Sequence, residues 1–430
     1  MGNILKTIRY FKRNGIKKTW YATAERLFYR DVPLSASECT YEGPIDEDIK
    51  FSVLVPVYET PKEYLREMID SVLGQAYGNF ELILADASGS EGPAGVIKSY
   101  RDARIKYIKV KENGGISANT NVALDAATGD YCALLDHDDF LDFDALYENA
   151  RVLSEAKRKG RKVNLIYSDE DKCNGDATKY FEPHIKENFN QDLILSNNYI
   201  CHFTVIKTSL LKEIRFRSEY DGAQDYDVIL RTIAHSEPSE ICHIGKILYH
   251  WRCHEESTAF NPASKEYAYE AGRRAIEDFL FNKYNKKISV TDLPHKGFYR
   301  VEWGEDIFEL RPELGAVGDL YIAGNKITRG IYSNLGHELF LNMNKHFSGY
   351  MHGAVLTRDV IACDIRTVTP APKMRETYEK LIKQLNEYTA NNKKSKADIH
   401  AFAGKLSMEF AEELQKQGLI FLFLPKIKRR

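Results

Sequence analysis

Short apolar runs alternate with amphipathic stretches of helical length over residues 51–290. The short runs predict buried strands, and apolar residues that recur every three or four positions predict helices that cover them. Strands alternating with helices join by right-handed crossovers into a mostly parallel sheet with helices on both faces. The expected strands are 51–57, 80–85, 105–110, 131–135, 165–167, 200–206 and 244–251, and the expected helices are 62–73, 117–127, 144–159, 225–235 and 265–284.

Polar side chains follow several of these strands where the apolar run stops. Tyr58 and Glu59 follow the first strand, Asp86 follows the second, and Asp-His-Asp-Asp at 136–139 follows the fourth. Sheets of this kind bind ligands just beyond the carboxyl ends of their strands. We therefore expect one ligand site at this edge of the sheet.

The strongest local signal is Leu-Leu-Asp-His-Asp-Asp at 134–139. In extended backbone Asp136 and Asp138 project to the same side, so they can share one hard cation. Mg²⁺ and Mn²⁺ prefer carboxylate oxygens together with substrate phosphates, and the pair therefore suits a metal-bound diphosphate. The alternative is that these aspartates only end a strand through their turn chemistry.

A further carboxylate, Asp225, stands at the expected start of a helix, in Gly-Ala-Gln-Asp-Tyr-Asp at 222–227. A carboxylate in this place can be a helix N-cap, and one that points into a cleft can accept a proton from a hydroxyl nucleophile. The combination with the metal motif favours the second role.

A third group lies in Tyr-His-Trp-Arg-Cys-His at 249–254, where His250, Arg252 and His254 share one face if the segment is extended. Imidazole can complete a metal shell, and guanidinium binds phosphate oxygens. Two alternatives stay open. The neighbouring cysteines and histidines could form a structural zinc site, or the histidines could simply be packed in the core or at the surface.

Six segments taken together resemble glycosyltransferase family 2 of the GT-A fold. They are FSVLVPVYET, FELILADASGS, ENGGISANTNVALDAATGDYCALLDHDD, IYSDEDK, GAQDYDVILR and LYHWRCHEESTA, in this order. The resemblance covers about residues 50–290, and the branch that includes bacterial cell-wall and capsule rhamnosyltransferases is the most similar. It implies a Rossmann-like α/β catalytic domain and an inverting enzyme with a nucleoside-diphosphate sugar as donor.

The resemblance also implies roles for individual residues. Asp225 would be the catalytic base, Asp138 would bind Mn²⁺ or Mg²⁺, and Asp136 would face the ribose or the metal. The other expected contacts are Pro56, Tyr58 and Glu59 at the base and ribose, Asp86 at the base, Arg252, His254 and Ser257 in a loop over the diphosphate, and His254 or His250 as the last metal ligand. The family often has two acids where this chain has Asp86 followed by Ala87.

Charge is unevenly distributed along the chain. The 60 Lys and Arg residues nearly balance the 62 Asp and Glu residues, which argues against a nucleic-acid partner. Residues 1–30 nevertheless carry eight basic residues and one acid, so we expect a basic amphipathic helical arm over 1–35, followed by a linker over 36–50. Such an arm can lie on an anionic membrane surface or pack on protein.

Seven widely scattered cysteines indicate a reducing compartment, and no apolar run reaches the length of a membrane span. These features predict a cytoplasmic location, peripheral at the inner face of the cell membrane.

Residues 291–430 differ in composition from the catalytic domain expected at 51–290. Some segments, such as Gly-Ala-Val-Gly-Asp-Leu-Tyr at 315–321, resemble the later half of a second family domain. We find no second metal motif and no acid that matches Asp225 in this region. We therefore expect an accessory α+β domain, either a degenerate second half or an unrelated helical cap, which positions the acceptor, mediates a homo-oligomer or docks a pathway enzyme.

The predicted function is an inverting, metal-dependent glycosyltransferase of bacterial surface polysaccharide biosynthesis. Its donor would be a UDP- or dTDP-sugar and its acceptor a lipid-linked glycan. The alternatives are a catalytically weak glycan-binding or scaffold protein of the same pathway, and a sugar-phosphate nucleotidyltransferase. The latter class has a Gly-rich basic loop after its first strand, and the sequence PVYETPKEYL at 56–65 contains no glycine.

Overall fold

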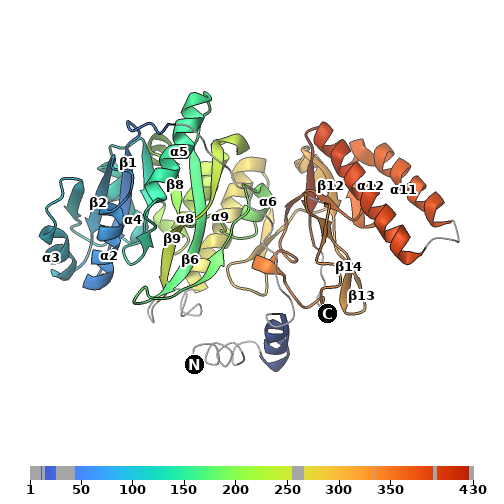
Figure 1. Ribbon diagram of the computed structural model, residues 1–430, viewed down its shortest axis with the longest axis horizontal. Helices are drawn as coiled ribbons and strands as arrows, with labels where there is room; N and C mark the ends of the chain where they lie inside the picture. Colours follow the sequence, from blue (N-terminus) through green and yellow to red (C-terminus); the bar gives the residue numbers. More distant parts are fainter. Residues whose placement is uncertain are drawn as a thin grey trace. The chain divides into compact units, whose positions relative to one another are not determined.

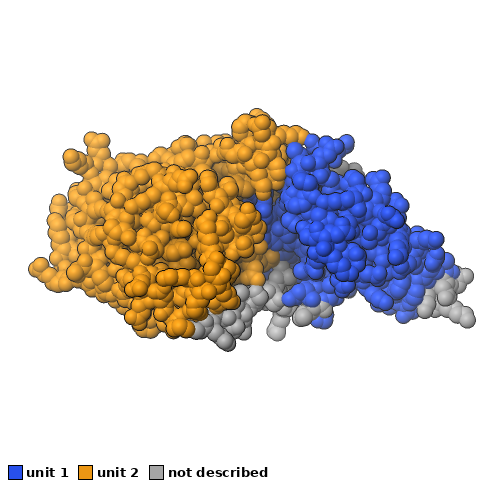
Figure 2. All heavy atoms as spheres, turned by 90° about the horizontal axis from the view of Figure 1, so that it is seen from above, with its two compact units in different colours: residues 1–34, 190–196, 303–430 blue, residues 35–189, 197–302 orange. Residues whose placement is uncertain are grey.

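The computed structural model describes residue 11 and residues 15–25, 44–253, 266–334, 336–390 and 395–425. The described residues fall into two compact units (Figure 2). The larger unit comprises residues 35–189 and 197–302, and the smaller unit comprises residues 1–34, 190–196 and 303–430. The short segment 190–196 therefore belongs with the later part of the chain.

The described part of the larger unit is built on a nine-stranded sheet (Figure 1). Seven strands follow the order β3-β2-β1-β4-β8-β6-β9, β5 pairs with β9 at that edge, and β7 pairs with β6. The strands are β1 (Phe51–Val57), β2 (Phe80–Asp86), β3 (Ile105–Lys109), β4 (Tyr131–Leu134), β5 (Phe140–Leu141), β6 (Leu165–Asn174), β7 (Tyr180–His184), β8 (Thr204–Lys207) and β9 (Ile241–Cys253).

The pairings confirm the expected α/β class and add antiparallel strands to the parallel sheet, since β5 runs antiparallel to β9 and β7 to β6. β1 runs parallel to β2 and β4, β2 to β3, and β6 to β9. β8 runs antiparallel to both β4 and β6, between which it lies. The parallel half thus brings the carboxyl ends of β1, β2 and β4 to one edge, as the alternating pattern predicted.

Helices flank this sheet on both faces. The apolar side of α2 and several residues of α5 share one core cluster with Val53 and Val55 of β1. Burying each such side chain contributes roughly 1.5–3 kcal/mol. α4 contacts β1 with residues outside that cluster, so it covers the opposite face. The helices of this unit are α2 (Lys62–Leu73), α3 (Gly92–Ser99), α4 (Ile116–Asp125), α5 (Ala145–Arg158), α7 (Thr208–Ile214), α8 (Gln224–Ala234) and α9 (Glu266–Tyr284).

A hairpin of β10 (Ser289–Asp292) and β11 (Tyr299–Glu302) follows α9 and ends the larger unit. Tyr299 of this hairpin is buried, and its hydroxyl donates to the Tyr269 carbonyl of α9 at 2.8 Å. The hairpin is thereby fixed to the helix that precedes it.

The smaller unit contains a four-stranded sheet of order β17-β20-β12-β19, with α11 and α12 against it (Figure 1). Phe410 and Leu414 of α12 join Phe421 and Phe423 of β20 in its core. Its elements are α6 (Gln191–Ile194), α10 (Ile307–Leu310), α11 (Arg375–Thr389), α12 (Lys396–Lys416), β12 (Leu314–Gly318), β13 (Tyr321–Ala323), β14 (Lys326–Arg329), β15 (Ile331–Tyr332), β16 (Glu338–Leu339), β17 (Arg358–Val360), β18 (Ala362–Cys363), β19 (Val368–Pro370) and β20 (Ile420–Phe423).

Residues 15–25 of the expected basic arm are helical and belong to the smaller unit. The Glu25 carboxylate accepts hydrogen bonds from the backbone N–H groups of Ser348 at 2.8 Å and Gly349 at 2.7 Å. The Tyr21 ring stacks on His346 with centroids 4.1 Å apart. Most of the remaining arm, and residues 36–43 of the linker, lie outside the described residues. Within the described residues, every helix is too short or too polar to cross a bilayer.

Candidate active site

The carboxyl ends of β1, β2 and β4 carry most of the residues that the sequence singled out. β1 ends at Val57, so Tyr58 and Glu59 lie in the loop that follows it. Asp86 is the last residue of β2, and Asp136 and Asp138 come directly after β4. Because these strands are parallel neighbours, the structure brings the three groups to one edge of the sheet.

Glu59 fixes the loops after β1 and β2 to one another. Its carboxylate accepts hydrogen bonds from the backbone N–H of Gly89 at 2.7 Å and from both the N–H and hydroxyl of Ser90. These hydrogen bonds, that of the Ser90 hydroxyl above all, lower the pKa of Glu59. Pro56 is half-buried within β1, whereas the Tyr58 ring is exposed. Tyr58 and Glu59 are both exposed, and the Tyr58 ring offers an apolar surface to a ligand.

Asp86 is fully buried and already has several partners. One carboxylate oxygen accepts the Ser88 N–H at 2.9 Å, and the other accepts the Tyr107 hydroxyl at 2.9 Å and lies 3.3 Å from Lys109 Nζ. Burial raises the pKa of Asp86, but the hydrogen bonds from Ser88, Tyr107 and Lys109 outweigh it and the pKa is lowered. The carboxylate is therefore ionised and held rigidly at the end of β2.

The aspartates after β4 divide into an exposed pair and a buried one. The side chains of Asp136 and Asp138 are 47% and 23% exposed, whereas Asp139 is buried. Asp139 accepts the Tyr249 hydroxyl at 2.6 Å and the Arg252 backbone N–H at 2.8 Å. Burial, followed by the negative charges of Asp138 and Asp136, raises the pKa of Asp139 well above its ordinary value. Asp139 thus anchors the turn, and Asp136 and Asp138 remain partly open to a ligand.

His250, one of the two alternative metal ligands, lies beside other carboxylates. Its Nδ1 is 2.7 Å from Asp171 and its Nε2 is 3.8 Å from Asp142, and its ring packs on Phe140. His254 and Ser257 lie outside the described residues. Within the described residues, no three His, Cys, Asp or Glu side chains are grouped closely enough to hold a metal ion. The carboxylate oxygens of Asp136 and Asp138 nevertheless fit Mg²⁺ or Mn²⁺ as a partial donor set.

Arg252 is fully buried beneath the metal motif. Its guanidinium donates to the backbone carbonyls of Asp138 at 2.8 Å and Gly175 at 2.6 Å, pairs with Glu67, and lies over the Tyr64 ring. Its backbone N–H binds Asp139, as noted above. In the described structure Arg252 therefore fixes the backbone that carries Asp138.

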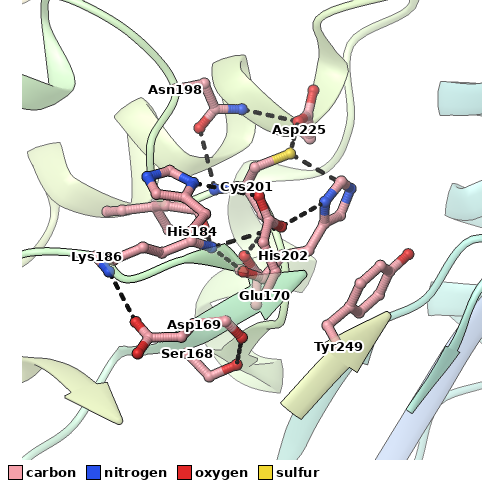
Figure 3. A network of polar contacts seen from close by, with 12 residues as sticks. Ser168, Asp169, Glu170, His184, Lys186, Asn198, Cys201, His202, Asp225 and Tyr249 are labelled. Carbon is pink, nitrogen blue, oxygen red and sulfur yellow. Dashed lines mark hydrogen bonds and ion pairs between the residues drawn. The ribbon is translucent and has the colours of Figure 1, made fainter. Parts of the chain in front are cut away.

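Asp225 lies in the first turn of α8, but it is not the helix cap. Ala223 occupies the N-cap position, and no side chain caps the helix. One oxygen of Asp225, Oδ2, accepts hydrogen bonds from Asn198 Nδ2 at 2.8 Å and from the Cys201 thiol at 3.1 Å (Figure 3). The capping alternative is thereby removed, and the carboxylate instead belongs to a polar network.

His202 is the residue of this network that sequence reasoning missed. Its Nε2 lies 3.9 Å from Asp136 Oδ2 and 3.3 Å from Cys201 Sγ, and its ring stacks on Tyr249 with centroids 4.5 Å apart. His202 thus stands between Asp136 and the residues that hold Asp225. The sequence placed it inside an expected strand over 200–206, whereas β8 begins at Thr204. The polar residues of 197–202, unusual for a buried strand, were the available signal.

A carboxylate–lysine pair underlies His202. Glu170 accepts from His202 Nδ1 at 3.0 Å and lies 3.6 Å from the Nζ of buried Lys186 (Figure 3). Burial raises the pKa of Glu170, but the charge of Lys186 and hydrogen bonds from two histidines bring it well below its ordinary value. Burial lowers the pKa of His202, but Cys201 and Glu170 raise it well above the usual range. His202 is therefore held with a fixed ring orientation, because Nδ1 faces a carboxylate.

A separate cavity of about 940 Å³ lies at the opposite ends of the strands, lined by residues such as Thr128, Tyr131 and Lys207. None of the candidate site residues is in its lining. The site is therefore defined by its convergent polar groups and not by this cavity.

Comparison with known proteins agrees with the family that the sequence motifs indicated. The family described as Glycosyl transferase family 2 matches residues 52–215. A glycosyltransferase of Methanocaldococcus jannaschii, MJ1057, is 30% identical over 46% of this chain and 69% of its own length. The putative glycosyltransferase EpsE of Bacillus subtilis is 30% identical over 54% of this chain and 86% of its own.

The chain thus belongs to glycosyltransferase family 2. The protein y4gI of Sinorhizobium fredii is 41% identical over 59% of this chain, which spans only 28% of that relative. A solved structure, Staphylococcus aureus TarS residues 1–349 with UDP, is similar with a TM-score of 0.43 and 22% identity over 54% of this chain and 66% of its own.

Proposed function

We propose that the chain transfers a sugar from a nucleoside-diphosphate sugar to a hydroxyl of a glycan acceptor, with inversion at the anomeric carbon. The observation that carries the proposal is the convergence of two partly exposed carboxylates, Asp136 and Asp138, with Asp225 through the segment of Asn198, Cys201 and His202. Membership of the family supports the reaction class.

The donor nucleotide binds over the ends of β1 and β2. The exposed ring of Tyr58 would contact the nucleobase and ribose, with Pro56 and Glu59 beside it. Asp86 would contact the nucleobase. The internal partners of Glu59 and Asp86 give these two residues a fixed position before any ligand arrives. The proposal expects UDP or dTDP as the nucleotide, and the motifs do not choose between them.

Asp138, with Asp136 beside it, would hold a divalent Mn²⁺ or Mg²⁺ ion. When bound, the ion supplies positive charge next to the diphosphate leaving group. Asp138 is suited to this because Arg252 fixes its backbone and Asp139 fixes the turn. Two predictions stay untested: a further metal ligand, His254 or His250, and contacts of the diphosphate with Arg252 and Ser257. The described contacts of Arg252 support a role in fixing the backbone of Asp138.

Asp225 is the general base. Its carboxylate accepts the proton of the acceptor hydroxyl, the hydroxyl oxygen bonds to the anomeric carbon, and the bond from that carbon to the diphosphate oxygen breaks. A single displacement from the face opposite the leaving group inverts the configuration. The position of Asp225 at the start of α8, with no capping role, supports this assignment.

The acceptor in this proposal is a lipid-linked glycan of bacterial surface polysaccharide synthesis at the inner membrane face. The relatives support the pathway: the 30% identical protein RfbC of Myxococcus xanthus is named for O-antigen biosynthesis. This chain spans 18% of the length of RfbC, so the likeness concerns the glycosyltransferase region. The basic arm supports contact with an anionic surface, and the smaller unit would position the acceptor, dimerise or dock a pathway enzyme.

Thermal unfolding with a panel of nucleotide sugars tests the proposal. A ligand that binds only the folded chain raises the unfolding midpoint. We expect a rise with sugars of one nucleotide, UDP or dTDP, that is larger when Mn²⁺ is present. No rise with any UDP-, dTDP- or GDP-sugar, with or without Mn²⁺, would contradict the proposal.

A further inference from the structure

The carboxylate of Asp225 is held from one side only. Asn198 Nδ2 at 2.8 Å and the Cys201 thiol at 3.1 Å both donate to Oδ2. Burial raises the pKa of the Cys201 thiol to about 12, so the thiol keeps its proton at neutral pH and can donate. Among the described residues, no hydrogen bond is made to Oδ1 of Asp225, which leaves that oxygen available to an incoming hydroxyl.

This asymmetry matters because the outer torsion of an aspartate is soft. Rotation about that bond has broad minima, so a carboxylate without partners samples many orientations. A general base has to lie within hydrogen-bond distance of the reacting hydroxyl, and a misplacement of about 1 Å can cost on the order of 10²-fold in rate. Two donors on one oxygen fix the plane of the carboxylate and so the direction of the other oxygen.

The donors are themselves fixed. Asn198 Oδ1 accepts the backbone N–H of Cys201 at 3.4 Å, which sets the orientation of the amide so that Nδ2 faces Asp225. The fully buried Lys186 donates to the Ile200 carbonyl at 2.9 Å and also to the His202 carbonyl (Figure 3). The segment 198–202 is thus tied to the sheet through buried groups, and its donors have a fixed position.

We propose that Asn198 and Cys201 are positioning residues of the transfer reaction, which hold Oδ2 of Asp225 so that Oδ1 faces the acceptor hydroxyl. The proposal rests on the proposed function, because it assumes that Asp225 is the base. It assigns a task to a segment between α6 and β8 that the family motifs quoted above do not include.

Steady-state kinetics of substituted chains test this proposal. The measured quantity is release of nucleoside diphosphate by the full chain, with water as the hydroxyl that receives the sugar, from UDP-glucose, UDP-N-acetylglucosamine or dTDP-rhamnose, using the donor that the unsubstituted chain cleaves fastest. We expect Asn198→Ala to lower kcat by about 10- to 100-fold while KM for the donor stays unchanged. Cys201→Ala should lower kcat less, because a thiol is a weak donor, and Cys201→Ser should restore most of the loss by supplying a hydroxyl.

Cys132→Ala is the matched control. Cys132 lies in β4, and its buried thiol is 3.3 Å from the hydroxyl of Thr208 in α7, so the substitution also removes a buried thiol contact. We expect it to change the unfolding midpoint without changing kcat. A kcat for Cys201→Ser as low as that of Cys201→Ala, or a raised KM at unchanged kcat in Asn198→Ala, would overturn the positioning role.

Crystal structures of the unsubstituted chain and of an Asn198→Ala, Cys201→Ala double variant separate this claim from the proposed function. We expect the Asp225 carboxylate to rotate in the double variant, and an unchanged carboxylate plane would overturn the claim. If no nucleotide sugar raises the unfolding midpoint of the unsubstituted chain, the proposed function fails, and the two structures still decide whether Asn198 and Cys201 orient Asp225.

Discussion

At the scale of single residues, the site depends on where each carboxylate is held and what holds it. Asp86 and Asp139 are buried with hydrogen-bond donors around them, whereas Asp136 and Asp138 stay partly exposed. A buried carboxylate with fixed donors shapes its loop, and a partly exposed one can accept a cation. The same residue type therefore serves two purposes within one turn.

Replacement of Asp138 tests the proposed metal site. We expect Asp138→Ala to remove the dependence of UDP or dTDP affinity on Mn²⁺, because the oxygens that would bind the ion are lost. Isothermal titration calorimetry with and without Mn²⁺ measures this dependence. Asp125→Ala is the control, since Asp125 forms a surface ion pair with Arg215 at 2.7 Å, and it should retain the full dependence. A metal dependence that survives in Asp138→Ala would remove Asp138 from the site.

Glu81 should control acid stability of the larger unit. Burial raises its pKa, but Lys106, Ser52, Thr128 and Lys50 outweigh burial and lower the pKa to about 2. Because the pKa of an unfolded glutamate is about 4.3, this stabilisation is complete above that pH and is lost as the pH falls toward 2. The shift corresponds to at most about 3 kcal/mol.

We therefore expect Glu81→Gln to lower the unfolding temperature at pH 7, with the difference from the unsubstituted chain shrinking as the pH falls to 3. Differential scanning calorimetry across this range measures it. Glu63→Gln, at an exposed position of α2, should show no such trend. A difference that stays constant or grows toward pH 3 would contradict the assignment.

At the scale of elements, the hydrophobic pattern located the parallel half of the sheet closely. The expected strand 51–57 is β1 to the residue, and 80–85 and 131–135 differ from β2 and β4 by one residue each. The expected strand 165–167 is much shorter than β6, which continues to Asn174. The expected strand 200–206 begins four residues before β8, because Cys201 and His202 serve the polar network instead. A pattern of apolar residues predicts which side chains are buried. It does not predict that two polar side chains distant in the sequence, such as Glu170 and His202, will form a hydrogen bond.

The same limit applies to the candidate site. The strand-end rule indicated Asp86, Asp136 and Asp138 because parallel strands deliver their ends to one edge. His202 carried no spacing signal, since its partners Glu170 and Tyr249 lie on other strands. The structure likewise placed Arg252 beneath the Asp138 backbone, which a pattern along one extended segment does not reveal.

Gly129 tests how tightly β4 is seated against β1. A Cβ at this position would lie 2.7 Å from the Lys50 carbonyl oxygen and from the Ser52 nitrogen, both backbone atoms. We expect Gly129→Ala to lower stability by about 1–3 kcal/mol, because rigid neighbours have to move. Gly78→Ala is the matched control, since a Cβ there meets nothing within 4 Å. Equal unfolding midpoints for the two variants in urea would contradict the close approach.

At the scale of the whole molecule, the smaller unit is built from three segments of the chain, residues 1–34, 190–196 and 303–430. Residues 190–196 belong to that unit, where Asp192 forms a buried ion pair with Arg311, and Asn190 exchanges hydrogen bonds with the Asp359 backbone. None of the strands and helices expected from the sequence covers this segment, because a four-residue helix has too few positions to show a period. The proposed positioning segment follows directly, so Asn198 begins just after the chain returns to the larger unit.

We propose that the larger unit is a glycosyltransferase whose base is Asp225 and whose donor site lies at the ends of β1, β2 and β4. These two parts can be separated by one substitution, because Asp225 is expected to contact the acceptor and not the nucleotide. Asp225→Asn keeps the shape of the side chain and removes its basicity.

The most direct measurement therefore compares Asp225→Asn with the unsubstituted chain, using the nucleotide sugar that raises the unfolding midpoint most. Calorimetry gives the affinity for that donor, and release of nucleoside diphosphate gives the turnover. The account predicts donor affinity unchanged and turnover reduced at least 10²-fold. Full turnover in Asp225→Asn, with donor still bound, would contradict it.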